Sequence, residues 1–94
     1  MPKEAKIFLV EDNIGYRETL VSFLIMEGHE VLAQAGSFEE ALDIIIRLLP
    51  EAVDVLLTDG NLSELSSGGT EGARVAGKFR EKFPDKSVLS ISGD

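Results

Sequence analysis

Short apolar runs alternate with longer amphipathic stretches along the chain, and this alternation predicts the secondary structure. The runs have the length of strands that are covered on both faces, and the stretches between them carry apolar residues at helical spacing. The resulting order, βαβαβαβ, predicts a parallel sheet with helices on its faces. The expected strands are Ile7–Val10, Val31–Ala35, Val53–Thr58 and Ser87–Ser92, and the expected helices are Ile14–Glu27, the segment between Ser37 and Pro50, and Thr70–Phe83.

Residues with strong end preferences mark the boundaries of these helices. Gly28 follows the first helix, at a position where glycine commonly ends a helix. Ser37 and Glu40 form a capping-box pattern that opens the second helix, with serine at the N-cap and glutamate three residues later. Pro50 closes the second helix and Pro84 the third. The apolar positions of the first helix include Leu20, Phe23, Leu24 and Ile25, the expected core face of the second carries Ala41, Ile44, Ile45, Leu48 and Leu49, and the third has Ala76, Phe79 and Phe83 at helical spacing.

Polar residues follow three of the expected strands. Glu11 and Asp12 come after the first strand, Asp59 after the third, and Ser92 ends the fourth. Ligand sites of parallel α/β sheets lie outside the carboxyl ends of the strands, so these residues are candidates for one site. Carboxylates gathered there are costly unless a cation or a proton neutralises them. A purely structural interpretation stays open, in which Asp12 or Asn13 caps the first helix and Asp59 holds a turn.

The residue types favour phosphoryl chemistry with a divalent cation. Glu11, Asp12 and Asp59 offer hard oxygen ligands of the kind that Mg²⁺ takes together with waters and phosphate oxygens. A carboxylate beside bound Mg²⁺ can attack a phosphoryl group to form an aspartyl phosphate, because the metal offsets the repulsion between the two anions. Ser92 could give a hydroxyl to the new phosphoryl oxygens, and Gly93 would let the backbone approach closely.

Composition narrows the choice of partners. The formal net charge of −8 opposes nonspecific binding to nucleic acid or to an anionic membrane. The absence of cysteine excludes disulfides and thiolate metal sites. There is no apolar run long enough for a membrane span and no apolar signal segment, so we expect a cytoplasmic chain. The basic residues Arg74, Lys78 and Lys82 would share one helix face, either solvated and paired with neighbouring acids or docking an acidic partner.

The chain resembles the receiver domains of response regulators in two-component signalling over nearly its whole length. The resemblance rests on Phe8-Leu9-Val10-Glu11-Asp12-Asn13, Asp54-Val55-Leu56-Leu57-Thr58-Asp59-Gly60-Asn61-Leu62, Glu71-Gly72 and Val88-Leu89-Ser90-Ile91-Ser92-Gly93. It implies a flavodoxin-like fold and a phosphoryl group received from a sensor histidine kinase or a phosphotransfer protein. It implies these roles: Asp59 as phosphoacceptor, Glu11 and Asp12 as the acidic pair that holds Mg²⁺, the backbone carbonyl of Asn61 as a third ligand position, and Ser92 as the switch hydroxyl.

Several positions depart from the pattern of that family. The acidic pair is Glu-Asp where Asp-Asp is frequent, Leu62-Ser63 stand in place of a common Met-Pro pair, and the Gly- and Ser-rich stretch after Asp59 is long. This stretch is either a spacer or the rim of an active site. The family continues with a helix, a fifth strand and a final helix, whereas residues 1–94 hold no lysine after Lys86. We therefore expect an incomplete receiver-like domain whose last strand is an exposed edge, open to self-association or to strand or domain exchange.

Two alternatives to a signalling phosphoacceptor stay open. One is a receiver-like protein-interaction module that is not phosphorylated. Another is a small hydrolase of the haloacid-dehalogenase type, which needs a second aspartate two residues after Asp59, where this chain has Asn61. A phosphoacceptor that is no enzyme, beyond weak self-phosphotransfer or autodephosphorylation, is the leading hypothesis.

Overall fold

Four parallel strands form one sheet in the order β2-β1-β3-β4. The computed structural model describes residues 4–59 and 71–91. The elements follow one another as β1 (Lys6–Val10), α1 (Ile14–Met26), β2 (Glu30–Ala35), α2 (Phe38–Arg47), a 3-10 turn (Pro50–Ala52), β3 (Val55–Asp59), α3 (Glu71–Lys82) and β4 (Ser87–Ile91). The predicted βαβαβαβ order and the parallel sheet are confirmed. Within the described ranges, no helix is long and apolar enough to cross a membrane.

The third strand begins two residues later than the sequence pattern predicts. Val53 is buried but belongs to no strand, because the chain leaves the 3-10 turn there and Asp54 makes other contacts. The amide of Asp54 donates to the carbonyl oxygen of Lys6 at 2.8 Å, and its carboxylate accepts from the amide of Lys6 at 2.9 Å. Asp54 thereby joins the start of β1 to the segment before β3.

Side-chain caps start the first two helices. Asn13 is the N-cap of α1, and its Oδ1 accepts from the amide of Tyr16 at 2.8 Å. Ser37 caps α2 as predicted, with its hydroxyl accepting from the amide of Glu40 at 3.2 Å. The Glu40 carboxylate reaches back to the amide of Gly36 at 2.7 Å, one residue before the N-cap. Gly28 ends α1 with a φ of +92°, as its place after the helix predicts.

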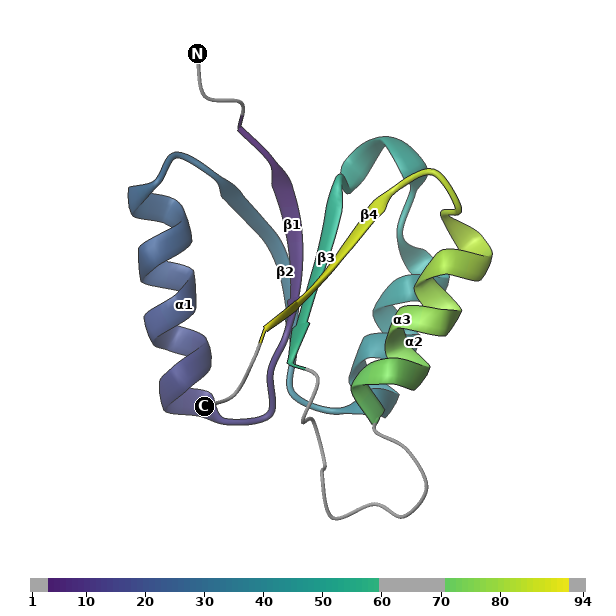
Figure 1. The fold of residues 1–94 in the computed structure, drawn as a ribbon, viewed down its shortest axis with the longest axis horizontal. Coiled ribbons are helices and arrows are strands. Elements are labelled where there is room, and N and C mark those ends of the chain that lie inside the picture. Colours follow the sequence, from purple (N-terminus) through teal and green to yellow (C-terminus); the bar gives the residue numbers. More distant parts are fainter. Residues whose placement is uncertain (1–3, 60–70, 92–94) are drawn as a thin grey trace.

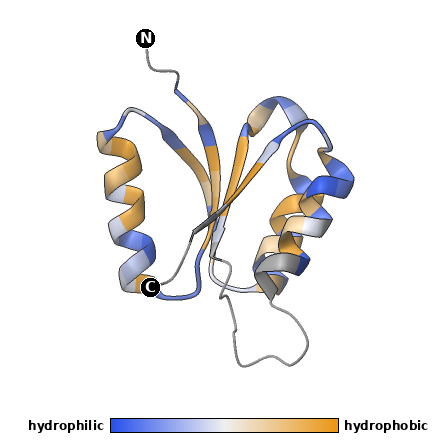
Figure 2. Cartoon of the chain, in the orientation of Figure 1, coloured by the Kyte–Doolittle hydropathy of each residue, from blue (hydrophilic) through white to orange (hydrophobic). Residues whose placement is uncertain are grey.

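The two faces of the sheet are covered unequally. Helices α2 and α3 lie side by side on one face, and α1 lies alone on the other (Figure 1). The main core lies between the sheet and the α2–α3 layer, and Figure 2 shows that hydrophobic residues run along the strands and also along α1. The buried residues of this core are Phe8, Val10, Ala35, Ala41, Ile45, Leu48, Val53, Leu56, Val75, Ala76, Phe79 and Phe83.

Two large apolar side chains of α1 and one residue expected in the core are exposed. Phe23 and Ile25 of α1 are 52% and 58% exposed, and Leu49, which was expected on the core face of the second helix, is 59% exposed. Leu24 alone is buried along α1, because a single helix on a sheet face can bury only the narrow stripe that touches the strands. Leu49 lies beyond the end of α2, where the chain has turned into the extended conformation.

Lys82 of α3 ties the two helices of the α2–α3 layer together. Its ammonium group donates to the carbonyl oxygens of Ile45 and Ile46, at 2.7 and 2.8 Å. These carbonyls belong to the last turn of α2, where helical carbonyls lack partners and the helix dipole attracts cations. Arg74, on the same face of α3, lies 4.3 Å above the ring of Phe38 at the start of α2. Two of the three residues of the predicted basic face, Arg74 and Lys82, therefore contact α2.

We expect Lys82→Met to lower the free energy of unfolding by about 1 kcal/mol, because two carbonyls of α2 lose a charged donor. Urea unfolding followed by circular dichroism measures this change. Lys78→Met is the matched control: Lys78 is exposed on the same helix, and its loss should change the stability by under about 0.5 kcal/mol. Equal effects of the two substitutions would contradict the capping role of Lys82.

Candidate functional site

The register of the sheet gathers the carboxyl ends of three strands. Val10 lies opposite Thr58, and Asp59 lies opposite Ile91. Glu11 therefore follows β1 beside the end of β3, and β4 ends next to the same point. Strand order reverses between β1 and β3, since β1 connects to β2 on one side while β3 lies on the other. This is the place where parallel α/β sheets bind their ligands.

Glu11 is buried and held by backbone contacts from two directions. Its side chain is 1% exposed, and its Oε2 accepts from the amide of Asn13 at 3.0 Å. Its own amide donates to the carbonyl oxygen of Ala35 at 2.9 Å, which extends the pairing of β1 with β2. The carboxylate is thus positioned at the end of the sheet by the strands themselves.

Asp12 stands beside Glu11 with a different environment. Its side chain is exposed, and of the two N-caps that the sequence allowed for the first helix, Asp12 or Asn13, the structure has Asn13. Because Oδ1 of Asn13 supplies the cap, the exposed Asp12 carboxylate is accessible to solvent or to a ligand. The pair therefore combines one buried and one exposed acid at the same edge of the sheet.

The donor set at this edge suits a hard cation. Carboxylate oxygens are the ligands that Mg²⁺ prefers, and a buried carboxylate such as that of Glu11 is costly without compensating charge or hydrogen bonds. In the part of the chain that the structure describes, no group of three or more His, Cys, Asp or Glu side chains could hold a metal. The remaining predicted site groups, which are Asn61, Ser92 and the side chain of Asp59, lie outside the described residues.

Arg17 belongs to the surroundings of the acidic pair, and sequence reasoning missed it. Its Nη1 donates to the carbonyl oxygen of Glu11 at 2.9 Å. The guanidinium lies against Gly36, where a Cβ atom would come within 2.5 Å of Nη1. Glycine at position 36 therefore leaves room for Arg17 to reach the loop after β1. No sequence signal marks this contact, because the acceptor is a backbone carbonyl.

Thr58 is a second residue near the site whose environment the sequence did not reveal. It directly precedes Asp59, its side chain is 2% exposed, and its hydroxyl makes no hydrogen bond among the described residues. The end of β3 thus carries a buried hydroxyl directly before Asp59.

Comparisons with known proteins agree on the class of fold. The receiver domain of non-phosphorylated HemR from Leptospira biflexa superimposes with a TM-score of 0.74 at 28% identity, covering 95% of this chain and 64% of that one. The receiver domain of PhyR from Erythrobacter litoralis superimposes with a TM-score of 0.75 at 19% identity, and the match covers 95% of this chain and 63% of that one. The fold is therefore the flavodoxin-like α/β fold expected from the sequence.

Sequence similarity leads from the fold class to the family. The chain is 35% identical over 88 residues to the response regulator protein FleR of Pseudomonas aeruginosa. The aligned residues make up 94% of this chain and 17% of the length of FleR. No protein-family model matches the chain. Together with the similarity to the HemR receiver domain, the match to FleR shows that the chain is a response-regulator receiver domain.

We expect Arg17→Met to shift the amide resonances of Glu11, Asp12 and Asn13 and to cost about 1 kcal/mol of stability, because the loop after β1 loses a charged hydrogen bond. Amide NMR and urea unfolding measure the two effects. Arg47→Met is the control, since its pairing with Asp43 at 3.3 Å is solvent-exposed and contributes little. Unchanged resonances of Glu11 to Asn13 in the Arg17 variant would contradict the positioning role.

Proposed function

We propose that this receiver domain accepts a phosphoryl group on Asp59 with the help of Mg²⁺. The observation that supports the proposal is the pairing of β1 with β3, in which Val10 lies opposite Thr58 and buried Glu11 follows next to the end of β3. In this proposal Glu11, Asp12, Asp59 and the backbone carbonyl of Asn61 hold the metal, which supplies positive charge to the reacting phosphoryl oxygens.

The proposed reaction transfers a phosphoryl group to a carboxylate. An oxygen of Asp59 forms a bond to phosphorus, and the bond between phosphorus and the donor atom breaks. With a phosphohistidine donor, the electron pair of the broken P–N bond stays on the imidazole nitrogen, which takes up a proton. The Ser92 hydroxyl donates a hydrogen bond to a phosphoryl oxygen of the product, which links the new charge to the end of β4.

The proposed partners follow from this chemistry. The donor is a sensor histidine kinase, a phosphotransfer protein or a small phosphodonor, and the domain acts in the cytoplasm. It is a phosphoacceptor in this scheme, with self-phosphotransfer or autodephosphorylation as its only catalytic steps. A receiver-like module that binds its partner without phosphorylation remains the competing function, and the experiment below separates the two.

Incubation with acetyl phosphate and Mg²⁺ should add the mass of one phosphoryl group to the native chain. Intact-mass spectrometry detects the adduct. Asp59→Ala should take up no phosphate, and Asp12→Asn should label at least tenfold more slowly because the metal loses a ligand. Removal of Mg²⁺ by a chelator should have the same effect on the native chain. Absence of label on the native chain, or equal labelling of Asp59→Ala, would favour the unphosphorylated module.

We further propose that residues 1–94 alone self-associate through the β4 side of the sheet. β4 is an edge strand in the described sheet, and Leu89 on it is 55% exposed. On the same face, Phe23, Ile25 and Met26 of α1 are more than half exposed. An exposed strand edge beside apolar surface favours pairing with a second copy.

Sedimentation velocity over a range of micromolar concentrations should then show a dimer or larger species. Leu89→Lys should shift the population at least tenfold toward monomer, because a charge on an edge strand opposes edge-to-edge pairing. Gln34→Lys, at an exposed position of the opposite edge strand β2, is a control for added charge. A monomer at every concentration would contradict the proposal.

A further inference from the structure

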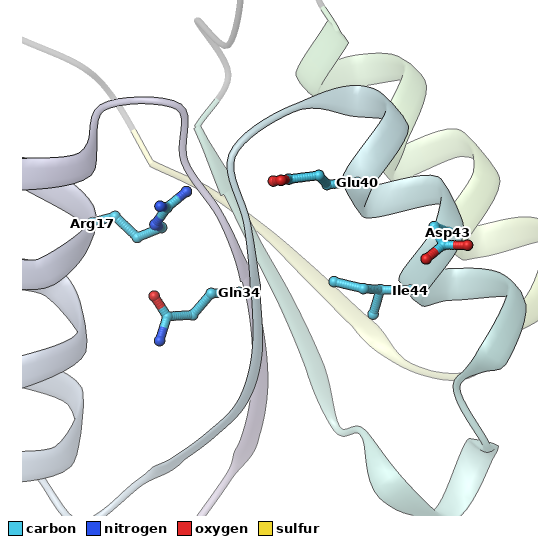
Figure 3. Close-up of a pocket in the computed structure, with 5 residues that line it drawn as sticks. All are labelled: Arg17, Gln34, Glu40, Asp43 and Ile44. Carbon is cyan, nitrogen blue, oxygen red and sulfur yellow. The ribbon is translucent and has the colours of Figure 1, made fainter.

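The opposite edge of the sheet carries a polar pocket that is separate from the acidic pair. Five residues line it: Arg17 from α1, Gln34 from β2, and Glu40, Asp43 and Ile44 from α2. Its volume is about 320 Å³. Because α1 and α2 lie on opposite faces of the sheet, a pocket lined by both must cross the edge at β2 (Figures 1 and 3).

The backbone of β2 is open along this edge. β2 is the outermost strand, paired only with β1 in the described sheet. The carbonyl oxygen of Ala35 points toward β1, where it accepts from Glu11. Successive residues of a strand direct their backbone groups to alternate sides, so the amide and carbonyl of Gln34 face away from β1. The amide of Gly36 also faces away, and the Glu40 carboxylate accepts its hydrogen.

The acidic side chains around this open backbone lie on the α2 face of the sheet, and the basic side chain of Arg17 lies on the α1 face. Figure 3 shows Arg17 and Gln34 on one side of β2, with Glu40 and Asp43 on the other. Glu40 and Asp43 are exposed and lie one turn apart on α2, so one wall carries two carboxylates, of which that of Asp43 also pairs with Arg47 at 3.3 Å in a solvent-exposed contact. The chain as a whole has a net charge of −8, which strengthens the attraction for a basic ligand.

We propose that the β2 edge is a docking groove for an extended, basic peptide segment of a partner protein, which adds to the sheet as an antiparallel strand. The amide and carbonyl of Gln34 pair with one residue of the peptide, and that residue projects onto the α1 side, next to Arg17. The residues on either side of it project onto the α2 side, where lysine or arginine meets Glu40 and Asp43. The pairing of backbone groups supplies affinity and the acidic wall supplies selectivity.

The probe is a short capped peptide of alternating lysine and threonine, and the matched control alternates glutamate and threonine. Titration of the lysine peptide at low salt should shift the amide resonance of Gln34 in a saturable manner and leave that of Leu89, on the opposite edge, in place. The glutamate peptide should bind at least tenfold more weakly. Shifts confined to the β4 edge, equal binding of the two peptides, or no binding of the lysine peptide would overturn the proposal.

Charge substitutions test whether Glu40 and Asp43 form the acidic wall that binds the peptide. Glu40→Gln with Asp43→Lys should weaken binding of the lysine peptide at least tenfold, while the glutamine still accepts from the amide of Gly36. The control variant, Glu81→Gln with Asp85→Lys, changes the net charge equally on exposed positions around the end of α3 and should bind as the native chain does. Equal weakening by both pairs would mean attraction to overall charge, which overturns the groove. Urea unfolding of each variant ensures that folded proteins are compared.

Backbone methylation tests the strand pairing itself. In the proposed register the threonine amides of the peptide face β2 and the lysine amides face solvent. N-methylation of the threonines should therefore reduce affinity at least tenfold, and N-methylation of the lysines should leave it within about twofold. If both methylated peptides bind like the parent, the peptide is held by charge alone and strand addition is wrong.

Discussion

The pairing of β1 with β3 is the interaction on which the arrangement of this domain depends. β1 lies in the middle of the sheet, so Phe8 and Val10 pack into the α2–α3 core while Ile7 and Leu9 are buried on the face of α1. If the register of β1 against β3 shifted by one residue, the side chains of β1 would exchange faces of the sheet, and Glu11 would move away from the end of β3. The same apolar contacts that stabilise the sheet therefore also bring the acidic pair to the carboxyl end of the strand that holds Asp59.

Long basic side chains connect the elements around this frame by reaching backbone carbonyls. Lys82 crosses from α3 to the last turn of α2, and Arg17 crosses from α1 to the carbonyl of Glu11. Both use a flexible apolar stem to carry charge to a backbone carbonyl of a neighbouring element. Arg17 also lines the pocket at the β2 edge, so one residue contacts both the loop of the proposed metal site and the proposed peptide groove.

Local signals in the sequence predicted local structure well and burial less well. Ser37 and Gly28 mark helix ends in the structure as they do in the sequence, because capping and left-handed conformations depend on a few neighbouring residues. The start of β3 was predicted two residues early, since an apolar run cannot reveal that Asp54 bonds to Lys6. Leu49 was assigned to the core face of the second helix because helical spacing indicates which residues share a face, and it does not indicate that α2 ends at Arg47.

For the candidate site too, the sequence predicted residue types and local order, whereas burial and long-range contacts came from the structure. The sequence by itself determined that acids follow β1 and β3, that the strands alternate with helices, and that charge opposes nucleic-acid partners, because these properties follow from residue type and short-range order. Only the tertiary structure decided that β1 and β3 are neighbours, that Glu11 is buried while Asp12 is exposed, and that Arg17 joins Glu11 to the β2 edge. Strand order and burial arise from packing between residues far apart in the chain, and many arrangements share one pattern of alternation.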